Sequence, residues 1–133
     1  NNEYQSISEA LDICSSISKY AYRTECFGSL ISNHFDPNLC DGVSEKTLTA
    51  CSSKMDMTLQ RKVSNKDYKT LAEALVYCNK IADSNNREEC FYSLAVSEKD
   101  KSYCKNLTID HWKYYCDQIY FDANGNLIPP RLR

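Results

Sequence analysis

The sequence predicts an all-α fold: two tandem four-helix repeats held by four disulfides, packed as a short solenoid or bundle, with an extended C-terminal tail. Two observations lead to this class. Apolar residues recur at the three- and four-residue spacing of helices, and a pattern of eight cysteines falls into two similar halves. The 133 residues contain only three glycines and three prolines, which disfavours a loop-rich or all-β fold.

An internal duplication defines the repeats. Thirteen of the 32 positions from 9 to 40 carry the same residue 64 positions later. The first copy contains Cys14, Cys26, Cys40 and Cys51, and the second contains Cys78, Cys90, Cys104 and Cys116. Cys116 lies one residue further along the chain than this offset requires. We therefore expect repeat 1 over residues 6–53 and repeat 2 over residues 67–119.

The spacing of apolar residues predicts the first two helices of each copy. The first helices carry apolar residues on one face, namely Ile7, Leu11, Cys14 and Ile17, and again Leu71, Leu75, Cys78 and Ile81. We expect polar turns over residues 18–22 and 83–86, with the second helices beginning near Arg23 and Arg87. An arginine opposes the dipole at a helix start, so we expect both arginines to hydrogen-bond the turn.

Capping residues predict the other two helices of each copy. Asp36 followed by Pro37 is typical of an N-cap and the first helical position. Ser44 and Thr108 are expected to cap the fourth helices. Each copy is thus predicted to have four short helices, with one cysteine in each.

Two segments depart from the repeat. Residues 54–66 are expected to be a linker, with a short strand as the alternative because Met55, Met57 and Leu59 alternate with polar residues. Residues 120–133 form the tail, in which Asn124-Gly125 indicates a tight turn and Pro129-Pro130 an extended exit.

The cysteines indicate disulfides rather than a metal site or haem. Neighbouring cysteines lie at least 11 residues apart, unlike the close pairs that bind zinc, and the two histidines are not repeat equivalents. We expect no metal and no cofactor. The duplication leaves two pairing schemes, one sequential (14–26, 40–51, 78–90, 104–116) and one nested (26–40 within 14–51, 90–104 within 78–116). The sequential scheme is favoured because Cys14 and Cys26 lie almost symmetrically about a turn near residue 20, and Cys78 and Cys90 about a turn near residue 84.

Disulfides indicate an extracellular or cell-surface location. The chain begins at Asn1 without a charged and apolar leader, so we expect a mature secreted form. The units EALxxCxxI, RxxCFxSL and DxxxC, at residues 9–40 and 73–104, resemble cysteine-containing helical-hairpin repeats of predicted secreted archaeal proteins. The resemblance covers about residues 6–118. It implies a stacked helical repeat outside the cytoplasm and no particular activity.

Aromatic residues gather near the C-terminus. Tyr and Trp are favoured anchors of protein interfaces, and they also stack on sugars. The residues predicted for an interface are Trp112, Tyr115, Tyr120, Phe121, Leu127 and Ile128. Asn106 begins an Asn-Leu-Thr glycosylation sequon. Asp122, Asn124 and Asn126 have the alternate spacing of a calcium loop, but its required glycine and glutamate are missing, so a turn is preferred.

The net charge and the motifs that the sequence lacks disfavour several classes of function. A formal net charge of −2 disfavours nucleic acid as a partner, and no apolar run is long enough to span a membrane. Motifs of hydrolases, metalloproteases and phosphate-binding loops are missing, so we expect no enzymatic activity. The predicted function is a structural protein that self-associates, through its repeats and tail, into a homo-oligomer or extracellular filament. The alternatives are a monomeric module that binds a peptide, glycan or small ligand, and a hydrolase with an unrecognised carboxylate pair.

Overall fold

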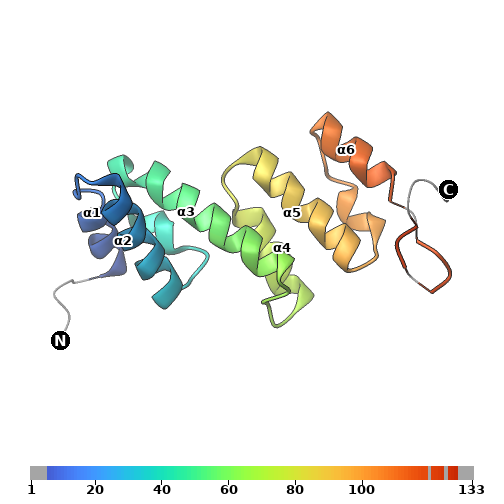
Figure 1. Ribbon diagram of the computed structural model, residues 1–133, viewed down its shortest axis with the longest axis horizontal. Helices are drawn as coiled ribbons and strands as arrows, with labels where there is room; N and C mark the ends of the chain where they lie inside the picture. The colour runs from blue at the N-terminus through green and yellow to red at the C-terminus, as the bar shows by residue number, and fades with distance from the viewer. Residues whose placement is uncertain (1–5, 120, 125, 129–133) are drawn as a thin grey trace.

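The computed structural model describes residues 6–119, 121–124 and 126–128, and it is all-helical, as predicted. Figure 1 shows an elongated molecule in which α3 lies between the first two helices and the last three. The α-helices are α1 (Ile7–Cys14), α2 (Tyr20–Asn33), α3 (Glu45–Ser64), α4 (Leu71–Lys80), α5 (Ser84–Ser97) and α6 (Asp110–Asp117). Two 3-10 helices, η1 (Leu39–Gly42) and η2 (Lys101–Cys104), complete the described elements. The described helices include none that is both long and apolar enough to cross a membrane.

The disulfides follow the sequential scheme. All eight cysteines lie within the described residues and pair as Cys14–Cys26, Cys40–Cys51, Cys78–Cys90 and Cys104–Cys116. Each bond joins two successive helical elements, and each element carries one cysteine. The nested alternative is therefore wrong. Each bridge closes a loop of 11 or 12 residues, a constraint that stabilises a small hairpin by roughly 3 kcal/mol.

Neither a linker nor a strand occupies residues 54–64, because α3 continues through them. Met55, Leu59 and Val63 are almost completely buried. These residues are four positions apart and so lie on one helical face. Met57, which completed the apparent alternation, is 51% exposed. The period-two pattern was misleading because only every second member of it faces the core.

Helix boundaries differ from the prediction at several points. α2 and α5 begin three residues before the arginines, at Tyr20 and Ser84, so the expected turns are shorter. Asp83 accepts a hydrogen bond from Asn86 N–H at 2.9 Å, which starts α5 earlier. Ser44 is the N-cap residue of α3 by its backbone position, although its side chain makes no capping hydrogen bond. The equivalent in α6 is Ile109 rather than Thr108, because the second copy contains one extra residue before Cys116.

Contrary to expectation, Asp36 is not the N-cap of a helix but caps a tight turn before η1. It accepts a hydrogen bond from Asn38 N–H at 2.8 Å, and η1 begins only at Leu39. Its counterpart Asp100 accepts from Ser102 N–H at 2.9 Å and is itself the N-cap of η2.

The predicted role of the two arginines is confirmed. Arg23 Nη1 donates to Ile17 O at 2.9 Å and to Ser18 O at 3.3 Å. Arg87 Nη1 donates in the same way to Ile81 O at 2.9 Å and to Ala82 O at 3.4 Å. Both copies therefore hold the turn between their first two helices by the same contact.

The core does not divide where the copies divide. One cluster of buried side chains extends from Leu11 of α1 through Leu59 of α3 to Leu94 of α5. A second, smaller cluster contains Ala95, Leu107, Cys116 and Ile119. The second half of α3 thus joins the first copy to the first hairpin of the second, while η2 and α6 pack on the C-terminal part of α5 around a separate, smaller core.

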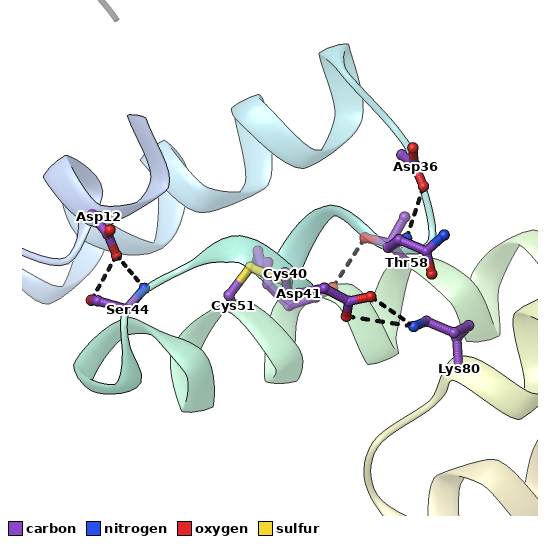
Figure 2. Close-up of a disulfide and its surroundings, with 10 residues drawn as sticks. Asp12, Asp36, Cys40, Asp41, Ser44, Cys51, Thr58 and Lys80 are labelled. Carbon is purple, nitrogen blue, oxygen red and sulfur yellow. Dashed lines mark hydrogen bonds and ion pairs between the residues drawn. A yellow bond between two sulfur atoms is a disulfide. The ribbon is translucent and has the colours of Figure 1, made fainter. Parts of the chain in front are cut away.

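Figure 2 shows contacts around the Cys40–Cys51 disulfide that join separate elements. On one side, Ser44 donates its N–H and its hydroxyl to Asp12 Oδ1, at 3.0 and 2.8 Å. On the other side, Lys80 of α4 forms an ion pair with Asp41 of η1 at 3.2 Å. The disulfide therefore lies between a contact within the first copy and a contact between the copies.

Candidate functional site

The aromatic surface consists of Tyr92, His111, Trp112, Tyr114 and Tyr115 and lies on α5 and α6. Tyr92 is 5.5 Å from Trp112 and 6.3 Å from Tyr115, between ring centroids. Trp112 is 5.8 Å from Tyr115, and His111 is 4.8 Å from Trp112. Tyr114 lies 6.0 Å from Tyr115. These distances are typical of interacting aromatic rings, so the five side chains form one connected patch.

The patch forms because the exposed tyrosines of α6 lie on a different face of the helix from the disulfide. Cys116 is buried on the core side of α6, whereas Tyr114 and Tyr115 are 61% and 48% exposed. Trp112 is half-buried against the small C-terminal core. Its Nε1–H donates to Asn85 Oδ1 at the start of α5, at 2.8 Å. The indole is therefore fixed, and the tyrosines beside it expose apolar and hydroxyl surface.

The described tail residues lie partly against this region. Phe121 packs against the same small core as Trp112 and forms an isolated antiparallel bridge with Leu127. Asp122 N–H donates to Asn126 O at 2.8 Å, so the chain reverses here as predicted. Leu127 is 52% exposed and Ile128 is half-buried. Tyr120 and Pro129-Pro130 lie outside the described residues.

The turn in the tail uses one of the three side chains that suggested a calcium loop as its acceptor, Asp122. Asp122 Oδ1 accepts from Asn124 N–H and Asn126 N–H, both at 2.9 Å. Among the described residues, no three His, Cys, Asp or Glu side chains are grouped to hold a metal ion.

The glycosylation sequon lies in the turn between η2 and α6. Asn106 is exposed, whereas Leu107 is buried in the small core. Thr108 donates its hydroxyl to Glu88 Oε2 at 2.7 Å, and the N–H of Ile109 donates to Glu88 Oε1 at 2.8 Å. The asparagine of the sequon is therefore accessible, while its threonine is held by a buried carboxylate.

Two of the three carboxylates with lowered pKa values, Glu88 and Asp12, hold the starts of helices. Burial raises the pKa of Glu88, but hydrogen bonds from Ile109 and Thr108 outweigh it and bring the pKa below the usual 4.5. The hydroxyls of Thr47 and Ser44 and the N–H of Ser44 lower the pKa of Asp12 from 3.8. Both carboxylates are thereby kept ionised at helix starts, which is opposite to what a general acid requires.

Sequence reasoning gave no indication of a groove of about 500 Å3 between α2 and α3. Its α2 side carries the small residues Gly28, Ser29 and Ser32, and its α3 side carries Lys54 and Arg61. A Cβ atom on Gly28 would lie 3.1 Å from Lys54 Cε. In the second copy Tyr92 occupies the position that Gly28 has in the first copy. A ring of the aromatic surface therefore lies where the first copy has the groove.

Comparison with known proteins adds no relatives. No family model matches the sequence, and neither a curated protein nor a solved structure matches it. The resemblance to archaeal hairpin repeats stays a prediction, and function must be argued from the side chains themselves.

Proposed function

We propose that this chain is a secreted, non-enzymatic structural protein that self-associates through the aromatic surface and the tail into an oligomer or extracellular filament. The single observation that carries the proposal is the aromatic surface. Its rings are connected, two of its tyrosines are about half exposed or more, and its tryptophan is held in place by Asn85. Rigid aromatic side chains of this kind anchor interfaces at low cost in conformational entropy.

The tail extends the same surface. Leu127 follows Phe121 in the tail and is 52% exposed, whereas Phe121 packs on the small core beside Trp112. A contact between this end of one molecule and a different face of the next would be heterologous. Heterologous contacts produce rings when they close and filaments when they do not. Four disulfides suit an assembly that must persist in an oxidising environment.

The test is the native mass of the purified protein, measured by light scattering over a range of concentrations, with electron microscopy of the same sample. We expect oligomers or polymers for the parent chain. Deletion of residues 122–133, or the double substitution Trp112→Ala with Tyr115→Ala, should give a folded monomer. Val76→Ser is the matched control, because Val76 is 49% exposed and lies on α4. A parent that is monomeric at every concentration, or polymers that survive both changes, would refute the proposal.

A second candidate is a monomeric binding module. The observation in its favour is the groove between α2 and α3, which is lined by small residues, by Lys54 and Arg61, and by one acidic side chain, Glu25. It predicts a monodisperse monomer and a ligand with anionic groups, a glycan or peptide among them. The same mass measurement separates the two candidates, and binding screens with the variant Gly28→Tyr, which fills the groove, would then test the second.

A further inference from the structure

The second half of α3 covers α4 and α5 through a defined set of contacts. Met55, Leu59 and Val63 supply its buried apolar side chains. Asp56, buried beside them, accepts from Ala82 N–H at 2.8 Å and from Asp83 N–H at 3.0 Å, at the start of α5. Gln60 Nε2 donates to Glu89 Oε1 at 2.8 Å. Three apolar side chains, the carboxylate of Asp56 and the amide donor of Gln60 therefore hold this interface together.

The first copy has the same receiving residues, and no helix among the described residues covers them. Ile17, Glu25, Cys26 and Leu30 are identical to Ile81, Glu89, Cys90 and Leu94. In the second copy Ile81, Cys90 and Leu94 are at most 1% exposed. In the first copy Ile17, Cys26 and Leu30 are only half-buried and Glu25 is exposed.

Two neighbouring positions show the same difference. Ile13 is 47% exposed, whereas its counterpart Tyr77 is 7% exposed. Tyr22 is 61% exposed, whereas its counterpart Asn86 is half-buried. We call this uncovered set, Ile13, Ile17, Tyr22, Glu25, Cys26 and Leu30, the α1–α2 face. The two helices that carry it, α1 and α2, lie at the end of the molecule opposite α6 (Figure 1).

The backbone donors are also in place. Arg23 holds the turn before α2 by the contact that Arg87 makes before α5. The N–H groups of Ser18 and Lys19 therefore occupy the positions of those of Ala82 and Asp83, which Asp56 binds. Within the described residues neither N–H has an acceptor, and Lys19, the N-cap of α2, makes no capping hydrogen bond through its side chain.

We propose that the α1–α2 face binds an amphipathic helix of a partner polypeptide. That helix carries apolar residues at positions i, i+4 and i+8, a carboxylate at i+1 and a hydrogen-bond donor at i+5, as Met55, Leu59, Val63, Asp56 and Gln60 do in α3. The carboxylate accepts from Ser18 and Lys19, and the donor binds Glu25. The described C-terminal part of this chain offers no such helix, because α6 ends at Asp117 and a tight turn follows. The inference is independent of self-association through the aromatic surface.

The probe is a capped peptide with the sequence of residues 52–66, titrated into the intact, oxidised, isotope-labelled protein and followed by amide chemical shifts. We expect shifts at Ser18, Lys19 and Leu30. The Asp56→Asn peptide should bind about tenfold more weakly, since it loses a charge-assisted hydrogen bond. The double variant Ile13→Ser with Tyr22→Ser should lose binding by a similar factor. Val76→Ser, of matched exposure on α4, should bind as the parent does.

A second experiment attaches the helix covalently to the chain, which removes the entropic cost of ordering a free peptide. Residues 52–70 replace residues 1–6 ahead of Ile7, which reproduces the connection between the second half of α3 and α4 without adding a second copy of Cys51. Hydrogen exchange at Ser18 and Lys19 should then slow toward that of Ala82 and Asp83, and Asp56→Asn in the added helix should reverse the effect. Protection in this chimera without measurable peptide binding still supports the docking face. Unchanged exchange in the chimera, or peptide shifts confined to Ala82 and Asp83, would overturn the proposal.

Discussion

At the scale of single residues, three carboxylates bind the starts of helices. Each carboxylate belongs to another element and so positions the helix relative to that element. Asp12 binds the start of α3, Asp56 the start of α5, and Glu88 the start of α6. A carboxylate that accepts backbone N–H groups satisfies donors that have no partner within the helix, and it interacts favourably with the helix dipole. Because Asp12 belongs to α1 and Glu88 to α5, the fourth helical element is attached to a different helix in each copy.

Glu88 makes stability depend on pH. Its pKa is lowered in the folded protein, so its contribution is present above the unfolded pKa and is lost as pH falls through the folded pKa. We expect Glu88→Gln to reduce the free energy of unfolding by about 2 kcal/mol at pH 7, since a buried charged acceptor is replaced by a neutral one. The difference from the parent should shrink below about pH 4.

Urea unfolding of the two proteins at pH 7 and at pH 3 measures this difference. Asp117→Asn is the control, because Asp117 is exposed at the end of α6. A constant difference between Glu88→Gln and the parent at both pH values would show that the packing of residue 88, rather than its charge, is what matters.

At the scale of elements, α3 is the helix on which both copies depend. Its first half carries Cys51 and belongs to the first copy, while its second half buries Leu59 and Val63 in the core shared with α4 and α5. Most helical stability in proteins comes from such packing of an amphipathic face rather than from helix propensity. A helix of 20 residues thus replaces the linker expected between two independent repeats.

Truncation of Leu59 should therefore be costly. Leu59→Ala leaves a cavity at a fully buried position, and we expect a loss of about 3 kcal/mol in the free energy of unfolding. Met57→Ala, on the exposed side of the same helix, should change it by less than about 0.5 kcal/mol. Denaturant unfolding of both variants is the measurement. Equal effects at the two positions would mean that the burial pattern of α3 is wrong.

The local features of this fold could be predicted from sequence, and the relations between copies could not. Helix faces, the sequential disulfides and the arginine contacts depend on spacing within one hairpin, which the duplication shows twice. The course of α3 could not be predicted, because Met55, Met57 and Leu59 fit a strand until the packing partners on α4 and α5 are known. For the candidate site, Trp112 and Tyr115 were named from the sequence, and His111, four residues before Tyr115 on the same helix, could have been added from its spacing. Tyr92 joins them only through the packing of α5 on α6.

At the scale of the whole molecule, the two copies are joined unequally. The core that contains Leu59 extends across both copies, but η2 and α6 close over only the few side chains around Leu107 and Cys116. Small cores give little stability, and here the Cys104–Cys116 disulfide supplements one. The end of the molecule that carries the aromatic surface therefore packs on the smaller of the two described cores, whereas the end that carries the α1–α2 face is tied to the main core.

This inequality predicts local opening. The amides of α6 should exchange with solvent faster than those of α3 and α5, because regions with few buried apolar contacts open without global unfolding. Native-state hydrogen exchange over a series of low denaturant concentrations measures this local opening. The exchange rates of the α6 amides should depend only weakly on the denaturant concentration. Leu107→Ala should speed exchange in α6 and leave that of α3 unchanged, whereas Leu59→Ala should speed both. If all three helices exchange with one common free energy of opening, the molecule unfolds as a single unit and the division of the core has no energetic consequence.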